Sequence, residues 1–291
     1  MAKTKRDFKN KPSLKQSAQS FLFVLPSFIG VLIFVLIPFA DTIRRSFFTV
    51  KSWQFQGLTN YKSVLQNKAF QLAASNTAKF IGICIPLLIL LSIILALMVK
   101  SLSSSGDIFK TTFLLPMAIP VASIVLLWRA LFFEKGILNG VLVSMGKNPV
   151  DFMGTDAAFW VLIFTYLWKN CGYDMILWLS GMDGISPSLY EAAQVDGAGA
   201  LTSFRYITLP SLMPTLFLTV VLSLINTFKV FREAYLVAGS YPHKSIYLLQ
   251  HLFNNWFLEL DISRMSAAAV MVAIVLLVLI LLLQKMWNKD Q

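Results

Sequence analysis

Two groups of polar and aromatic residues lie inside stretches of the sequence that are otherwise apolar. Members of the first group recur at spacings of three and four residues, which places them on one face of a helix: Tyr166, Asn170, Tyr173, Asp174 and Trp178. The second group has the same spacing and consists of Asn226, Lys229 and Glu233. Their amide, hydroxyl and charged groups donate and accept hydrogen bonds, and their aromatic rings offer flat apolar faces. This combination is suited to binding a sugar ring.

The same residues also have a purely structural interpretation. A Lys or Asp near the centre of a bilayer costs about 2.5–3.5 kcal/mol on insertion scales, so such residues face a cavity or a partner. Lys229 and Glu233 can pair with each other, and Asp174 can pair with Lys169 or with a second chain. The sequence leaves the binding and the structural interpretation open for both groups.

The stretches that carry these groups have the composition of membrane spans. The 291-residue chain is 57% hydrophobic and only 13% charged, whereas a soluble domain is about a quarter charged. A spanning helix needs about 20 mainly apolar residues. The sequence therefore predicts an all-α membrane protein with six transmembrane helices, near residues 21–47, 77–99, 109–133, 157–182, 212–238 and 263–287.

The net charge of +11 is placed in a way that suits a membrane protein. Basic residues gather in the first 15 positions and near the ends of apolar stretches, which fits membrane topology better than nucleic-acid binding. They favour a cytoplasmic N-terminal tail (1–19), and six spans then place the C-terminus in the cytoplasm too. Five basic residues in the first outer loop, Arg44, Arg45, Lys51, Lys62 and Lys68, weaken that argument. The first apolar stretch is too long for a cleaved signal peptide, so it is expected to be retained.

One polar loop, at about residues 183–210, separates two of the apolar stretches. Ser186 and Pro187 form a typical helix start, and Ser188 with Glu191 form an alternative capping box. Gly197, and Gly199 after it, are natural positions for the helix to end. A second short helix over residues 201–206 would complete a helix-turn-helix elbow at the membrane face.

Seven positions of this loop have a distinctive spacing: Glu191-Ala192-Ala193, then Gly197, then Ile207 and Leu209-Pro210. The pattern is similar to the EAA loop of ABC importer permeases. Asp196, Ala198 and Phe204 extend the similarity toward the carbohydrate branch of that family, and maltose-permease-like subunits resemble the chain most. Further landmarks of the family are matched along nearly the whole chain, at Phe23-Val-Leu-Pro26, Gly57-Leu-Thr-Asn-Tyr61, Phe113-Leu-Leu-Pro116, Trp168-Lys-Asn-Cys-Gly-Tyr173 and Phe231-Arg-Glu-Ala-Tyr235.

The resemblance implies a function and a set of partners. Residues 20–291 would form the transmembrane domain of a sugar importer in the bacterial inner or plasma membrane. The chain would bind no cofactor of its own. Its partners would be a second homologous permease, two ATP-binding cassette subunits that hold ATP and Mg, an extracytoplasmic sugar-binding protein and membrane lipid. The coupling to the ATPase would fall to Glu191, Ala192, Ala193, Asp196, Gly197 and Ala198.

Other functions fit the sequence less well. No phosphate-binding Gly-rich loop occurs, so the chain is not expected to be an ATPase or another enzyme. Cys84 and Cys171 lie in apolar stretches without a Cys or His at ligand spacing, which predicts neither a disulfide nor a metal site. An ion-driven secondary transporter predicts internal repeats, and none is visible. An importer for another small solute, such as glycerol phosphate or an amino acid, remains an alternative because those permeases share the loop in a looser form.

Overall fold

The computed structural model describes residues 14–49, 52–102 and 106–287. The α-helices, in chain order, are α1 (Leu14–Val31), α2 (Ile37–Ser46), α3 (Thr59–Gln66), α4 (Lys68–Ser101), α5 (Gly106–Ala118), α6 (Val121–Phe132), α7 (Ile137–Ser144), α8 (Ala157–Asp183), α9 (Pro187–Val195), α10 (Ala200–Ser203), α11 (Leu209–Ser211), α12 (Met213–Thr227), α13 (Phe231–Ala238), α14 (Leu249–Leu258) and α15 (Ile262–Trp287). Short π-helical turns occur at η1 (Leu32–Leu36) and η2 (Phe204–Thr208), and 3₁₀ turns at η3 (Phe228–Val230) and η4 (Lys244–Ile246). The described residues contain no β-strand, as the all-α prediction requires.

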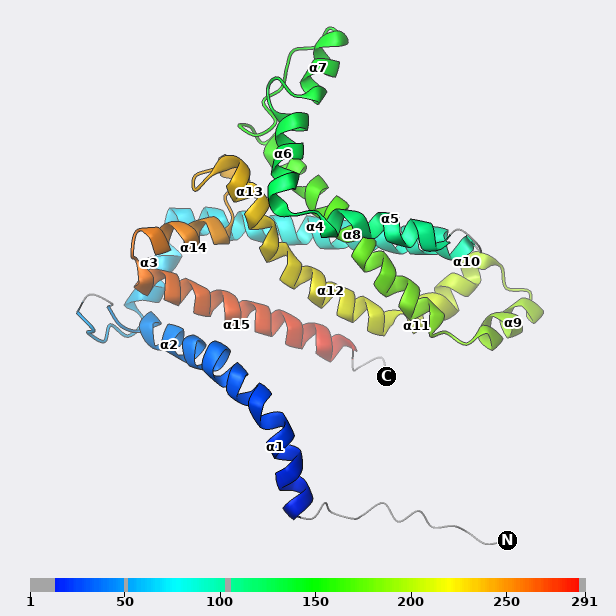
Figure 1. Ribbon diagram of the computed structural model, residues 1–291, viewed down its shortest axis with the longest axis horizontal. Helices are drawn as coiled ribbons and strands as arrows, with labels where there is room; N and C mark the ends of the chain where they lie inside the picture. Colours follow the sequence, from blue (N-terminus) through cyan, green and yellow to red (C-terminus); the bar gives the residue numbers. More distant parts are fainter. Residues whose placement is uncertain (1–13, 50–51, 103–105, 288–291) are drawn as a thin grey trace.

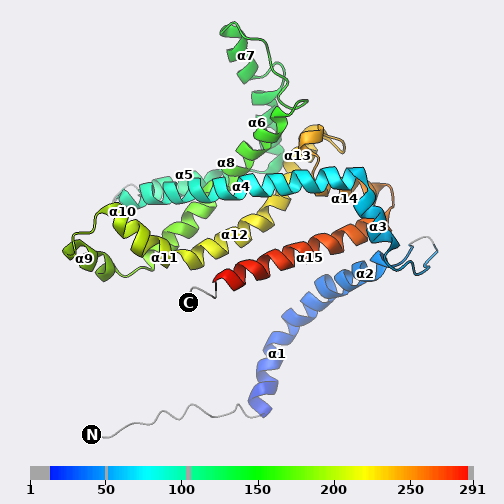
Figure 2. The ribbon, with the colours of Figure 1, turned by 180° about the vertical axis from the view of Figure 1, so that it is seen from behind.

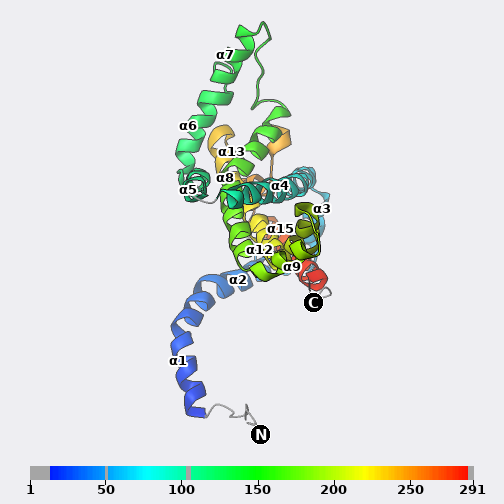
Figure 3. The ribbon, with the colours of Figure 1, turned by 90° about the vertical axis from the view of Figure 1, so that its right-hand side faces the viewer.

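A bundle of long helices forms the body of the molecule (Figure 1). Helix α4 packs on α8 and α12, and α15 packs on α2, α12 and α14. The loop that carries α9 lies at one end of the bundle, and α3 and α14 lie at the other, as the reverse view confirms (Figure 2). Helices α1 and α7 extend away from the body in different directions (Figure 3).

The lengths and hydropathies of the helices agree with a protein that crosses a membrane several times. Within the described residues, four helical segments are long and apolar enough to span: Phe21–Ser46, Lys68–Ser101, Met213–Ala238 and Ile262–Lys285. Helix α8 has 27 residues, about 40 Å at 1.5 Å per residue, but its polar residues lower its hydropathy. The membrane fold is thus confirmed, and the count of six spans stays a prediction.

The third predicted span, residues 109–133, is not one straight helix. The segments Gly106–Ala118 and Val121–Ser144 form an apolar pair that is bent by 92°. Pro120 precedes α6 with ψ 142°, outside the helical region. A proline has no N–H to donate and disfavours helical geometry in the residue before it. Pro86 has no such effect, because α4 continues through it.

Predictions about the chain termini fall partly outside the described residues. Helix α1 begins at Leu14, so the predicted tail (1–19) already becomes helical within its last residues. The remaining tail residues, Lys51 in the first loop and Lys289 at the C-terminus lie outside the description. Cys84 and Cys171 are free and buried.

Helices α5 and α8 pack tightly against each other at Gly172. A Cβ atom built on Gly172 would overlap the backbone carbonyl of Phe113, which cannot move without displacing α5. We expect Gly172→Ala to destabilise the purified protein by about 1–3 kcal/mol, as overpacking does, and thermal unfolding measures this. Gly82→Ala is the matched control on α4, because nothing lies within 4 Å of its Cβ position. Equal melting temperatures for the two variants would contradict this prediction.

Candidate functional site

The two polar groups predicted from the sequence meet at a cavity between α8 and the α12–α13 segment. This central pocket has a volume of about 180 Å³. The residues that line it are Met117, Thr165, Tyr166, Lys169, Asn170, Asn226, Lys229, Val230 and Glu233. Five residues of the two predicted groups therefore share one cavity: Tyr166, Asn170, Asn226, Lys229 and Glu233.

The charges of the central pocket are paired differently from the sequence prediction. The Lys169 Nζ donates to Glu233 Oε1 at 2.5 Å across the pocket. The Lys229 Nζ instead donates to Asn226 Oδ1 at 2.8 Å. The Lys229–Glu233 pair of the structural interpretation is therefore not formed. The 3₁₀ turn η3 contains Lys229 and winds about 120° per residue rather than 100°, which shifts this lysine away from the α-helical register with Glu233.

Glu233 has one carboxylate oxygen without a partner. The residue is 2% exposed, and its Oε2 atom is buried with no hydrogen-bond donor among the described residues. A buried acceptor without a donor is costly, so this oxygen is a natural contact for a hydroxyl group that enters the pocket.

Asp174 and Trp178 are buried inside the helix bundle, although their spacing suggested that they share a face of α8 with Asn170. Asp174 is 1% exposed and accepts a hydrogen bond from Ser223 Oγ at 2.9 Å. Of the two partners that the structural interpretation offered for Asp174, Lys169 is paired with Glu233 instead. Trp178, also 1% exposed, donates its Nε1–H to Ser92 Oγ at 2.9 Å. These two bonds fasten α8 to α12 and α4, and they leave no face of Trp178 open to the central pocket.

The positions of Tyr166 and Tyr173 also differ from the sequence prediction, which placed both on the binding face of α8. Tyr166 lines the central pocket, but its hydroxyl donates to the Ser223 carbonyl at 2.8 Å. Tyr173 is partly buried and is not among the lining residues. Lys169 does line the pocket, although the sequence suggested only a possible pairing role for it. Its position four residues after Thr165, inside an apolar stretch, was the available signal.

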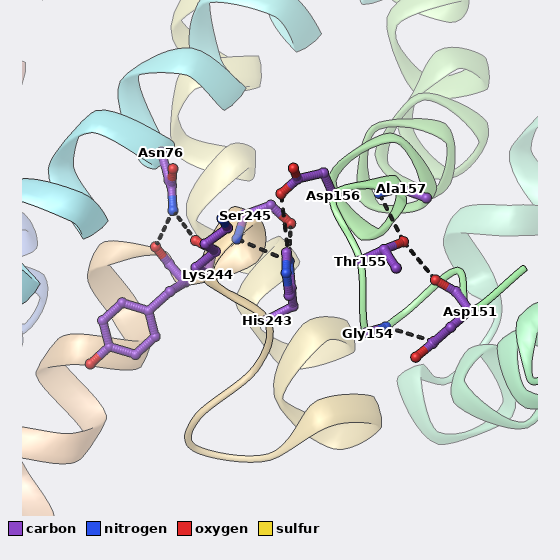
Figure 4. Close-up of polar contacts among 10 residues, drawn as sticks. Asn76, Asp151, Gly154, Thr155, Asp156, Ala157, His243, Lys244 and Ser245 are labelled. Carbon is purple, nitrogen blue, oxygen red and sulfur yellow. Dashed lines mark hydrogen bonds and ion pairs between the residues drawn. The ribbon is translucent and has the colours of Figure 1, made fainter.

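A second cavity, the distal pocket, lies away from α9, where α4 and α8 begin. It has a volume of about 410 Å³ and is lined by Leu72, Asn76, Lys79, Asp156, Phe159, Trp160, Lys244 and Ser245. Figure 4 shows how the loop after α13 is held there. The Asn76 Nδ2 donates to the Lys244 carbonyl at 2.6 Å and to the Tyr247 carbonyl at 3.0 Å. His243 Nδ1 lies 3.8 Å from Asp156 Oδ1.

A buried histidine supports the same loop. Burial lowers the pKa of His251 to about 4, so the ring is neutral at pH 7. Its Nδ1 accepts the Leu248 N–H at 3.2 Å, at the start of α14. This bond and those of Asn76 fix the backbone that forms one wall of the distal pocket.

The loop at the other end of the molecule has the predicted elbow shape. Helix α9 begins at Pro187 with Ser186 at its N-cap, as predicted, although no side chain caps it. It ends at Val195, and Gly197 with φ +76° forms the turn that follows. The Gly197 N–H donates to the Gln194 carbonyl at 3.0 Å, and the Ala198 N–H donates to the Ala193 carbonyl at 2.8 Å. These two bonds form a Schellman motif, in which glycine is favoured.

Helix α9 is exposed to solvent, and a hydrogen bond attaches it to η2. It contains no buried residue, and Glu191 and Ala192 face solvent while Ala193 is half-buried. The Tyr190 hydroxyl bonds the Thr208 Oγ1 at 2.9 Å, which ties α9 to η2. Large apolar side chains nearby are strongly exposed at Val195 (89%), Leu201 (80%) and Tyr206 (70%). An exposed apolar surface of this kind marks an interaction site.

Apolar helices around a polar pocket, with an exposed helical elbow at one end, define a membrane permease subunit. The chain belongs to the family described as binding-protein-dependent transport system inner membrane component, whose model matches residues 88–286. The chain is therefore a multi-pass inner-membrane component of an ABC transporter.

Individual relatives match most of the chain. The probable ABC transporter permease protein YurN of Bacillus subtilis is 31% identical, over 92% of this chain and 95% of the relative. The lactose transport system permease protein LacF of Rhizobium radiobacter is 30% identical, over 78% of each chain. A chain of a crystallised bacterial ABC transporter that imports the acidic polysaccharide alginate superposes with a TM-score of 0.82 and 25% identity, covering 95% of this chain and 97% of that one.

Proposed function

We propose that this chain is a permease subunit of an ATP-driven importer for sugars and forms half of the translocation path. The central pocket carries this proposal, because it brings hydrogen-bonding groups from α8 and α12–α13 together inside an apolar bundle. The named substrates of two similar proteins, lactose and alginate, support a sugar. The other half of the path would come from a second, homologous permease.

Helix α9 is the proposed docking element for a separate ATP-binding cassette subunit. Ala192 and Ala193 have little bulk, so the helix can enter a groove of another protein. The exposed Glu191 can pair with a basic residue of that protein. Asp196, Gly197 and Ala198 hold the turn that follows. Because this end of the molecule would face the ATPase, both chain termini would be cytoplasmic, and the distal pocket would face the sugar-binding protein outside.

The test is co-expression of the chain with its second permease, ATPase and binding protein. We expect the ATPase to co-purify and oligosaccharide uptake to require ATP. Ala192→Trp should reduce ATPase recovery severely, because the added bulk blocks docking. Gln194→Ala is the control, since Gln194 lies about 200° around the helix from Ala192. Uptake that follows an ion gradient, or that serves only amino acids or glycerol phosphate, would contradict the proposal.

A further inference from the structure

The charges of the central pocket do not balance. Lys169 is neutralised by Glu233 at 2.5 Å, whereas Lys229 has only the neutral amide oxygen of Asn226 as its partner. Among the described residues no carboxylate lies within ion-pair distance of Lys229. The residues that line the pocket therefore carry one positive charge in excess.

An unpaired ammonium within a membrane-spanning segment is costly. Lys229 lies in the apolar segment Met213–Ala238 and its side chain lines the pocket. An anion that occupies the pocket would remove this cost. The buried Oε2 of Glu233 has the opposite requirement, because it needs a hydrogen-bond donor. One ligand satisfies both groups if it carries an anionic group and hydroxyl groups.

The distal pocket also has more positive than negative charge in its lining. Lys79 and Lys244 both line it and are exposed, and no described carboxylate is within ion-pair distance of either. Asp156 is the acidic residue of the lining, and it faces His243 at 3.8 Å. The Trp160 side chain is 60% exposed and provides an aromatic face beside the two lysines.

Helix α8 contributes residues to both cationic pockets. Trp160 lines the distal pocket and Lys169 the central one. Nine residues separate them, which is about 14 Å along a helix. A ligand that passes from one pocket to the other would meet excess positive charge at both.

We propose that the substrate is an acidic saccharide, a sugar that carries a carboxylate, sulfonate or phosphate group; this inference rests on the proposed function. The anionic group pairs with Lys229 in the central pocket, and a sugar hydroxyl donates to Glu233 Oε2. Lys79 and Lys244 attract the same anion where it enters. The alternative is that a carboxylate of the second permease, and not the substrate, pairs with Lys229. The experiment distinguishes these two possibilities.

The experiment measures uptake by cells that express the complete importer. The probes are labelled uronic-acid trisaccharides of the glucuronate, galacturonate and mannuronate types, each paired with its neutral methyl ester, together with sugar phosphates and sulfonated sugars. The ester has the same skeleton without the charge. We expect one acidic class to be taken up in preference to its neutral counterpart. Lys229→Gln should lower the ratio of acidic to neutral uptake about tenfold, the equivalent of losing 1.4 kcal/mol, and Lys229→Arg should restore most of it.

The control variant is Lys285→Gln, because Lys285 is exposed near the end of α15 and lines neither pocket. It should leave the ratio unchanged. ATP-driven uptake of neutral saccharides alone would overturn the acidic substrate but leave the sugar importer intact. An unchanged ratio in Lys229→Gln would also overturn it, as expected if the second permease neutralises Lys229. Uptake of no saccharide at all, with ATP-driven uptake of another solute, would instead refute the proposed function.

Discussion

Gly197→Val is expected to abolish ATP-driven uptake, whereas Gly199→Val should retain most of it. Gly197 has φ +76°, a conformation that β-branched residues avoid strongly. Gly199 has φ −75° and ψ 171°, which is ordinary extended backbone. Neither position has an atom within 4 Å of a built Cβ. The two variants therefore add the same side chain in open space and differ only in backbone strain.

The strain would act through the end of α9. The Schellman bonds of Gly197 and Ala198 to Gln194 and Ala193 require the left-handed turn. If valine forces another conformation, α9 and the α10–η2 segment no longer keep their relative angle, and movement of a bound ATPase is not passed to α12. The measurements are uptake, the amount of permease in the membrane and the recovery of the ATPase. Normal uptake by Gly197→Val would show that this turn is not needed for coupling.

The sequence was sufficient to predict the elbow because its signals are local. Pro187 marks the first turn of α9 and Gly197 its end, and both act through the backbone of neighbouring residues. The long apolar helices are equally predictable, since their composition alone excludes a soluble surface. The 92° bend before α6 could not be predicted in the same way. Pro116 lies within α5 while Pro120 follows its end, and a single proline does not reveal which of these outcomes applies.

The pairing of charged residues could not be predicted from spacing. Lys169 and Glu233 are 64 positions apart and meet because α8 and α13 line the same pocket. Periodicity places a residue on a face of its own helix but does not determine which neighbour that face meets. Asp174 and Trp178 show the same limit, because α12 and α4 cover the part of α8 on which they lie.

Glu233→Ala is expected to destabilise the protein far more than removal of an exposed carboxylate. The side chains of Lys169 and Glu233 are 21% and 3% exposed. Loss of one partner from a buried pair leaves the other charge uncompensated and costs about 3–5 kcal/mol. The matched control is Asp107→Ala, which breaks the Lys110–Asp107 pair at 2.9 Å, where the Asp107 side chain is 94% exposed. An exposed pair contributes little to stability because water and salt screen its charges. Thermal unfolding of the purified complex measures both.

A double variant distinguishes a structural role of this pair from a role in transport. Lys169→Met combined with Glu233→Leu replaces both charges with apolar groups, and such replacements of buried pairs are often neutral or stabilising. We therefore expect the double variant to regain the melting temperature lost in Glu233→Ala. It should still fail in sugar uptake, because it has lost the Oε2 acceptor that no described residue satisfies. Recovery of both stability and uptake would show that the pair serves only to hold α8 against α13.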